Sequence, residues 1–558
     1  MTALANLPLT IEETPRSQVT VRRVCRFALL VGMSVFFCLF LRLAFTLHDN
    51  FAYMTFDLGI FDQAVWLISQ GKTPFVTARG IHILGDHFSV ILYLLAPIYA
   101  LIPSPKTLLF LQTLAVTLGA IPAYALARKR LGSELHGLLF GIVYLLYPAH
   151  QWGITYEFHP DMFATPLLFA ALYALETKRF RMYAVVLFLT ALIKESAGLT
   201  IALVGIWACF HQRKVGIQTI VFGVVMLAVA MLTVRHFNDG QPSPYFDIFR
   251  HYGSSPGDII GNFLRRPLPF LAEVFQLGNL FYLGLMLISL CFLPLLAPEI
   301  LLLTLPLWLI NFMAGRPGMH TFEEYYNSFI TPFLFLGAII GFQRLEKWSW
   351  FTRWLVRLNL PLWALTGIAM SPFAQPIAEL YTTRPPAEAV AECRAAVARI
   401  PRTASVAAQM ALGAHLTQRT QLYTFPNPFV RIAYGGTKQA LFEIDSVTGS
   451  TLPAKLEPAI VPNFANAEYI ALCPKSNPFP LSENNYTRLV VALLQSRNYE
   501  TEYVGGYVML LRRVPPQTAK LEQLAHRTKL PVQTSKQIEN AYWRWLARQY
   551  PPPKGKTP

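Results

Sequence analysis

Long apolar runs constrain this chain more than any other feature of its sequence. The first extends from Phe27 to Leu47, and a helix needs about 20 predominantly apolar residues to cross a bilayer. Only 14% of the residues are charged, whereas soluble domains carry about 25%. The sequence therefore predicts an integral membrane protein of the inner or plasma membrane. The first run is too long for a cleaved signal peptide, and no small-residue cleavage site follows it.

Clusters of Lys and Arg beside the apolar runs predict the orientation. The cluster that begins at Arg22 precedes the first run, so the positive-inside rule places residues 1–26 in the cytoplasm. The segment 87–102 is apolar but short, and we expect it to lie on the outer membrane surface. In that arrangement the basic cluster 127–130 and each later one fall inside. These clusters also account for the net charge of +16, and without a nucleic-acid-binding motif no nucleic-acid partner is expected.

The same rules predict an α-helical membrane bundle of about eleven transmembrane helices at 27–372, with an outer loop at 48–105. The expected membrane helices are 27–47, 106–127, 134–149, 162–176, 182–193, 197–210, 215–234, 281–297, 299–314, 326–342 and 354–372.

The chain beyond the bundle has the composition of a soluble protein. Helices are expected at 386–399, 484–497 and 536–549, and strands at 404–409, 420–424, 467–473 and 500–513. This alternation predicts a C-terminal extracytoplasmic α/β domain at 373–515, followed by a basic tail at 516–558. Two of the six cysteines, Cys393 and Cys473, lie in this domain, where an oxidising compartment would allow them to pair.

Ionisable residues gather on the predicted outer face. Such groups are costly at membrane depth and tend to mark function. They are Asp57, Asp62, His82, Asp86, His87, Glu157, His159, Asp161, Lys194, Glu195, His251, His320, Glu323 and Glu324.

The first outer loop holds two of these clusters. Asp57 and Asp62 are five residues apart and do not share a helical face well, so one acid is expected to face a site. Asp57 is either a general base or metal ligand, or an N-cap of the apolar run that follows it. Asp86 and His87 either take part in proton transfer or in binding a cation or phosphate, or Asp86 caps a helix that begins at His87.

Two further clusters lie at later outer turns. Glu157, His159 and Asp161 fall within five residues of a short loop, a density that solubility alone does not explain. Lys194 and Glu195 form the tip of a helical hairpin. Lys194 either binds a phosphate, as ammonium groups do, or snorkels and pairs with its neighbour.

Several stretches of the sequence resemble a known family. They are FDLGIFDQAVWLISQG, GDHFSVILYLLAPIYAL, EFHPD and LIKES, followed by SVAAQMALGAHLTQR, LYTFP and GGYVMLLRR in the C-terminal part. Together they resemble a bacterial and archaeal family of predicted membrane proteins of unknown function, over nearly the whole chain.

The layout is in turn similar to that of the GT-C superfamily of integral-membrane glycosyltransferases. Those enzymes place an acid in the first outer loop, matched by Asp57, and a glycine about fourteen residues later, matched by Gly71. A Pro-containing surface helix follows, matched around Pro97. A lysine between the fifth and sixth helices matches Lys194, and a second outer-loop acid matches Glu157.

The resemblance implies transfer of a sugar from a polyprenyl-phosphate donor to an acceptor on the extracytoplasmic face of the cell envelope. Asp57 and Glu157 are then the catalytic candidates. The candidates for binding substrate or phosphate are Asp62, Asp86, His87, His159, Lys194 and Glu195. The expected partners are the lipid-linked sugar donor and membrane lipids.

Several points stay open at this stage. The donor sugar, the acceptor and a requirement for a divalent cation are undetermined, because no diagnostic metal-ligand spacing occurs. The alternatives to an enzyme are a non-catalytic scaffold or sensor, and a lipid or solute transporter. A transporter predicts inverted repeats and ionisable residues near the bilayer midplane, and the sequence shows neither pattern.

Overall fold

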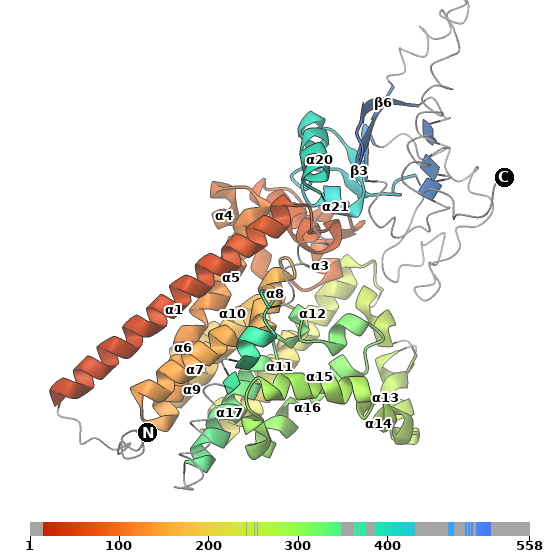
Figure 1. Ribbon diagram of the computed structural model, residues 1–558. Helices are drawn as coiled ribbons and strands as arrows, with labels where there is room; N and C mark the ends of the chain where they lie inside the picture. Colours follow the sequence, from red (N-terminus) through yellow and green to blue (C-terminus); the bar gives the residue numbers. More distant parts are fainter. Residues whose placement is uncertain are drawn as a thin grey trace, which may run out of the picture.

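A computed structural model shows a helical bundle with a small mixed domain at one end (Figure 1). The structure describes residues 15–241, 243–249, 251–253, 255–346, 362–363, 365–374, 386–429, 467–473, 486–487, 489–490, 493–494 and 498–514. The basic tail, the expected helix at 536–549 and the first part of the expected helix at 354–372 lie outside these residues.

The bundle follows the predicted order of helices. Its helices are α1 (Pro15–Asp49), α5 (Pro105–Leu118), α6 (Ala120–Leu131), α7 (Glu134–Leu146), α8 (Pro148–Thr155), α9 (Ala164–Glu176), α10 (Phe180–Ala191), α11 (Ala197–Cys209), α12 (Arg213–Phe237), α13 (Pro256–Arg265), α14 (Pro267–Val274), α15 (Leu277–Ile288), α16 (Pro298–Phe312) and α17 (Thr331–Leu345). Pro105, Pro148, Pro256 and Pro298 each stand at the first turn of a helix, where a missing N–H costs nothing.

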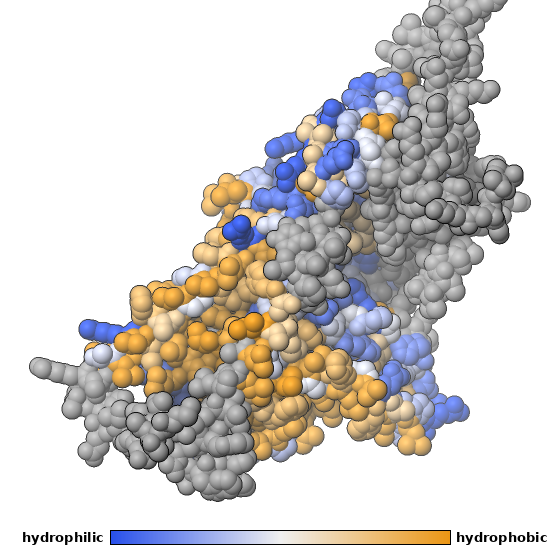
Figure 2. Space-filling model, in the orientation of Figure 1, coloured by the Kyte–Doolittle hydropathy of each residue, from blue (hydrophilic) through white to orange (hydrophobic). Residues whose placement is uncertain are grey.

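Three helical stretches within the described residues are long and apolar enough to cross a membrane. They are Val19–Asp49, Pro105–Leu131 and Arg213–Phe237, and the pair α14–α15, bent by 48°, would make a fourth. Shorter apolar helices pack beside them. Figure 2 shows hydrophobic residues over the visible face of the bundle and hydrophilic residues toward the C-terminal domain. The number of about eleven spans and the orientation of the termini remain predictions.

Glycines set the close approach of α11 and α12. A Cβ on Gly198 would lie 2.6 Å from the backbone nitrogen of Leu227, and one on Gly223 would lie 2.5 Å from that of Ala202. Small residues of this kind let membrane helices pack backbone to backbone. The contact fixes the start of α11, and therefore the turn that carries Lys194 and Glu195.

The loop between α1 and α5 folds into short elements on the end of the bundle. They are η1 (Thr55–Gly59), α2 (Ile60–Ser69), β1 (Phe75–Val76), β2 (Ile81–His82), α3 (Ile83–Asp86) and α4 (Ile91–Leu101). Two interpretations as helix caps are wrong. Asp57 lies inside η1, and neither η1 nor α2 has a side-chain cap. His87 is extended and the next helix begins at Ile91, so Asp86 caps nothing there.

The C-terminal domain is a five-stranded mixed sheet with helices. Its elements are α20 (Ala387–Arg399), β3 (Val406–Ala408), α21 (Met410–Gly413), β4 (Leu422–Thr424), β5 (Tyr469–Leu472), β6 (Tyr499–Val504) and β7 (Met509–Arg513). The strand order is β4-β3-β5-β7-β6, with β3 parallel to β4 and β5, and β7 antiparallel to β5 and β6. The expected α/β alternation is therefore present in the described part.

This domain is bonded directly to the loop after α1. Asp62 is fully buried and accepts hydrogen bonds from the Thr417 hydroxyl and, at 2.7 Å, from the Tyr99 hydroxyl. Burial raises the pKa of Asp62 to about 7, although both hydrogen bonds lower it. Gln63 Nε2 adds a bond of 3.0 Å to the carbonyl of Arg419. Asp62 therefore joins the two parts of the protein.

The Thr417 hydroxyl gives a direct test of this junction. Thr417→Val removes the donor and leaves one oxygen of a buried carboxyl unpaired, which costs about 1–3 kcal/mol. We expect faster proteolytic cleavage of the C-terminal domain from the membrane-embedded protein. Thr417→Ser keeps a hydroxyl and should behave like the wild type. Equal cleavage rates for the Val and Ser variants would show that this bond does not hold the domain.

Candidate functional site

Glu157 fixes the backbone on both sides of Asp57. Its Oε1 accepts the amide of Met54 at 3.0 Å, and its Oε2 accepts the amide of Leu58 at 2.8 Å. Glu157 itself has a φ of +77°, which is rare for a residue with a side chain. The carboxyl thus binds the backbone amides on both sides of Asp57, and its predicted catalytic role remains a prediction.

Gln112 of α5 holds the loop that carries Glu157 and His159. Its Nε2 donates to the carbonyl of Glu157 at 2.7 Å, and its Oε1 accepts the amide of His159 at 2.7 Å. Gln112 is fully buried. A single amide side chain therefore satisfies both backbone groups and fixes the loop against the bundle.

Asp57 and His159 form the central contact of the site. His159 Nε2 lies 3.1 Å from Asp57 Oδ1, and the imidazole stacks on the ring of Tyr325 with centroids 3.5 Å apart. The aspartate keeps partial exposure, whereas the histidine is buried. One carboxylate oxygen is thus held by the histidine while the group still reaches the site.

The charges at this contact follow from burial and neighbours. Burial acts to raise the pKa of Asp57, but the hydrogen bond and charge of His159 and the charge of Arg316 lower it below its ordinary value. Burial lowers the pKa of His159 despite the nearby carboxylate. Burial, and then the charge of Asp57, raise the pKa of Glu157 well above its ordinary value. The pKa values of the two neighbouring carboxyls, Asp57 and Glu157, are thus shifted in opposite directions.

The turn between α10 and α11 contributes two more charged groups. Lys194 Nζ lies 3.1 Å from Asp161 Oδ1, at the start of η2 (Pro160–Phe163). Glu195 Oε1 lies 3.0 Å from His87 Nδ1, and its Oε2 accepts the amide of Phe88 at 3.2 Å. The two neighbours pair with partners from other loops and not with each other, so the hairpin tip is bonded to two other segments of the chain.

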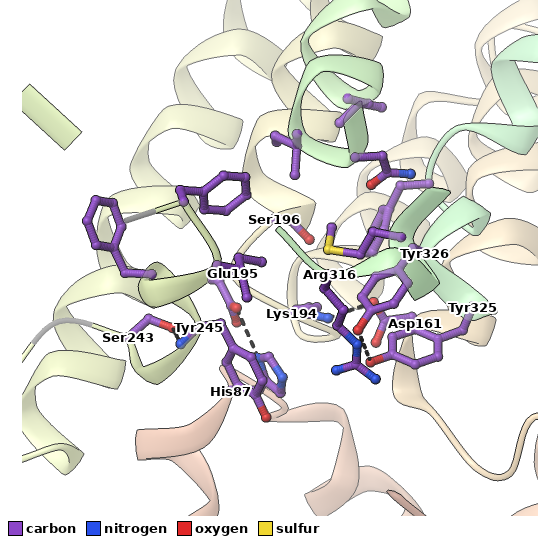
Figure 3. A pocket seen from close by; sticks show the side chains of 18 of the residues that line it. His87, Asp161, Lys194, Glu195, Ser196, Ser243, Tyr245, Arg316, Tyr325 and Tyr326 are labelled. Carbon is purple, nitrogen blue, oxygen red and sulfur yellow. Dashed lines mark hydrogen bonds and ion pairs between the residues drawn. The ribbon is translucent and has the colours of Figure 1, made fainter. Parts of the chain in front are cut away.

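These groups line one cavity of about 250 Å³ (Figure 3). Its polar wall carries the side chains of His87, Asp161, Lys194, Glu195, Tyr245, Arg316, Tyr325 and Tyr326. Its apolar wall carries Phe246, Ile248, Phe249, Leu307, Ile310, Met319, Phe329 and Ile330. A smaller cavity of about 20 Å³ shares five of the polar residues and extends to Asp57, Asp86 and His159. The two cavities together place a large apolar space next to Asp57.

The sequence did not point to Arg316, which precedes η5 (Pro317–His320). Within the described residues its guanidinium makes one long ion pair, 3.7 Å to Glu324, and lies 5.6 Å from the ring of Tyr326. It remains partly exposed in the cavity. A signal was present, because an arginine in a predicted outer loop is disfavoured by the positive-inside rule. Tyr245 was also missed, and it stacks on His87 with centroids 4.2 Å apart.

Most of the predicted site residues meet at this cavity, but not all. Asp57, Asp86, His87, His159, Lys194 and Glu195 line one or both spaces. Asp86 is paired with Arg79 at 3.2 Å. Asp62 and Glu157 line neither space: Asp62 binds Thr417, and Glu157 binds the amides of Met54 and Leu58. Among the described residues, no three His, Cys, Asp or Glu side chains gather in a geometry that would hold a metal ion.

Comparison with known proteins identifies the family. The model of a family described as predicted membrane proteins, DUF2079, matches residues 47–442. The chain belongs to this family. The predicted resemblance to a family of membrane proteins is thereby confirmed, and the protein is an integral membrane protein. A comparison with curated proteins finds no match.

Two solved structures are similar to this chain, both of ArnT from Cupriavidus metallidurans. The structure bound to undecaprenyl phosphate has 13% sequence identity and a TM-score of 0.49, and the match covers 87% of this chain and 98% of the ArnT chain. The apo structure has 13% identity and a TM-score of 0.47, with the same coverage. Since both TM-scores are below 0.5, the function proposed below is argued from the residues of this chain.

Gln112 provides a test of how the site is held. Gln112→Leu leaves the carbonyl of Glu157 and the amide of His159 unpaired in a buried place, at about 1–3 kcal/mol for each group. We expect a lower thermal unfolding midpoint in detergent. Gln112→Glu keeps the acceptor for His159 and should fall between the leucine variant and the wild type. A midpoint for the leucine variant equal to that of the wild type would contradict this role.

Proposed function

We propose that this protein is a membrane glycosyltransferase that takes its sugar from a polyprenyl-phosphate donor and transfers it to an acceptor on the extracytoplasmic face. The observation that carries the proposal is a cavity lined by both apolar and charged side chains, Lys194 and Arg316 among them, with Asp57 in the smaller adjoining space. A lipid-linked phosphate ester needs the first two features, and proton removal from an acceptor needs the third.

The apolar wall supports binding of the isoprenoid part of the donor. Phenylalanine, leucine and isoleucine side chains of η3 (Pro244–Phe249), α16 and the segment before α17 form it. Burial of a hydrocarbon chain against such side chains contributes about 25 cal/mol per Å². The opposite wall is charged, so a ligand with a long apolar part and a charged head matches both walls.

Arg316 and Lys194 are the proposed phosphate ligands. Lys194 is already neutralised by Asp161, whereas Arg316 has only the distant carboxyl of Glu324. Burial also raises the pKa of Glu324. Among the described cations that line the cavity, Arg316 thus has the longest ion pair, and its planar donors suit a phosphate. His87 is held by Glu195 and lines the same wall.

Asp57 is the proposed general base. Its carboxylate takes the proton of an acceptor hydroxyl or amine while that oxygen or nitrogen bonds to the anomeric carbon. The bond from this carbon to the phosphate oxygen breaks, and polyprenyl phosphate leaves with the electron pair. Arg316 stabilises the charge that develops on the leaving phosphate. The Nε2–H group of His159 donates a hydrogen bond to Asp57 Oδ1 and holds the carboxylate in place, and Glu157 positions the turn.

Turnover of a panel of polyprenyl-phosphate sugars tests the reaction. The purified protein should release polyprenyl phosphate in the presence of an acceptor panel. Asp57→Asn removes the base and should lower the rate by about 10²–10⁴-fold. Asp49→Asn is the matched control, because Asp49 pairs with Lys106 away from the cavity. Donor binding without release by the wild type would favour the transporter or scaffold alternatives.

The role of Arg316 is tested by donor affinity. Arg316→Gln removes the charge and should weaken binding of the donor by about 10–100-fold, the value of a charge-assisted hydrogen bond. Arg316→Lys should restore part of the affinity. Arg266→Gln, on the exposed junction of α13 and α14, is the control for a lost surface charge. Unchanged affinity for polyprenyl phosphate in the glutamine variant would rule out this ligand role.

A further inference from the structure

Two cysteines meet in the interior of the C-terminal domain. Cys393 lies on α20 and Cys473 directly follows β5, and their sulfur atoms are 3.8 Å apart. Both side chains are buried. They are separated by 80 residues of sequence, so the fold alone brings them together. The remaining cysteines are Cys25, Cys38, Cys209 and Cys291, which lie in the helical bundle.

The backbone at each cysteine is held independently of the sulfur atoms. The amide of Cys473 donates to Gln409 Oε1 at 2.7 Å. On the other side, the carboxyl of Glu392 accepts the amides of Gly506 and Tyr507 at 2.8 and 2.6 Å and ties α20 to the turn between β6 and β7. The sulfur atoms must approach by about 1.8 Å to reach the disulfide bond length of about 2.0 Å.

We propose that Cys393 and Cys473 are a disulfide site, oxidised by exchange with the disulfide of a thiol–disulfide oxidoreductase. One cysteine thiolate attacks a sulfur of the donor disulfide, and a mixed disulfide forms as the donor bond breaks. The second thiolate attacks the cysteine sulfur of that mixed disulfide, and the donor leaves as a dithiol. Two electrons and the two thiol protons pass to the donor, so sulfur, charge and hydrogen balance.

The burial of both thiols limits when the exchange can take place. Because both side chains are buried in the folded domain, the exchange precedes the final packing of α20 on the sheet.

The disulfide would stabilise the part of the domain that contacts the candidate site, the segment around Gln409 and Met410. Gln409, which holds Cys473, directly precedes α21, and the carbonyl of Met410 in that helix accepts the hydroxyl of Thr55 at 2.8 Å. Thr55 begins η1, the turn that carries Asp57. A covalent link between α20 and β5 therefore stabilises the segment of the domain that rests on this turn.

Peptide mapping of the full-length protein tests this inference without any activity assay. The protein is taken from membranes with alkylating agent present and digested without reductant. We expect one cross-linked peptide pair joining Cys393 to Cys473, lost after reduction. Two fewer thiols should react with a maleimide before reduction than after it. Full alkylation of both cysteines without reductant, or a link to any other cysteine, would overturn the proposal.

Variants separate the bond from general effects of cysteine loss. Cys393→Ser and Cys473→Ser should each abolish the difference in thiol count, and Cys38→Ser, in α1, should leave it unchanged. Reductant should lower the unfolding midpoint of the C-terminal domain by about 5 °C or more in the wild type, but not in the Cys393→Ser variant. An equal effect of reductant on both proteins would contradict a stabilising disulfide. The outcome is independent of whether the protein transfers sugar.

Discussion

The contact between Asp57 and His159 is the constraint on which the rest of the site depends. It joins the loop between α1 and α5 to the loop after α8 at a distance of 3.1 Å. Neither loop is regular, and each is held by buried side chains: Glu157 fixes the turn around Asp57, and Gln112 fixes the loop around His159. The pKa of Asp57 is lowered by His159 and Arg316, whereas burial and the charge of Asp57 raise the pKa of Glu157.

The cavity combines two environments that rarely adjoin in a soluble protein. Side chains from α16 and η3 make one wall apolar, and the tip between α10 and α11 brings charge to the other. Nearly every cation on that wall already has a carboxylate partner, which removes the cost of burying an isolated charge. Arg316 differs from the others because its ion pair with Glu324 is long, at 3.7 Å. A phosphate bound at Arg316 would give its guanidinium a closer anionic partner.

The C-terminal domain belongs to the architecture of the site and is not an appendage. Its Thr417 donates a hydrogen bond to the buried Asp62, and the carbonyl of Met410 in its α21 accepts one from the Thr55 hydroxyl. Gly413 of that helix has no room for a Cβ, which would lie 2.0 Å from Thr55 Oγ1. The domain is thus hydrogen-bonded to both η1 and α2. The turn that carries Asp57 is held by the C-terminal domain through Thr55 and by Glu157 through its backbone amides.

Sequence alone predicted much of the local structure, because local structure depends on neighbouring residues. Apolar runs located the helices of the bundle, and the acid-rich loops located Asp57, His159 and Lys194. Contacts between segments that are distant in the sequence could not be predicted from the sequence. Asp62 seemed a ligand until its partner Thr417, 355 residues away, was visible. Arg316 and Tyr245 lie in loops without a local motif, so only the folded chain brings them to the cavity.

A structure of the protein with bound polyprenyl phosphate tests the central claim most directly. The account predicts the phosphate within hydrogen-bond distance of Arg316 and close to Lys194, with the isoprenoid chain along Phe246, Phe249 and Leu307. Asp57 would then face the phosphate across the smaller cavity, where the sugar is transferred. A phosphate bound away from Arg316, or a lipid that leaves this cavity empty, would contradict the proposed site.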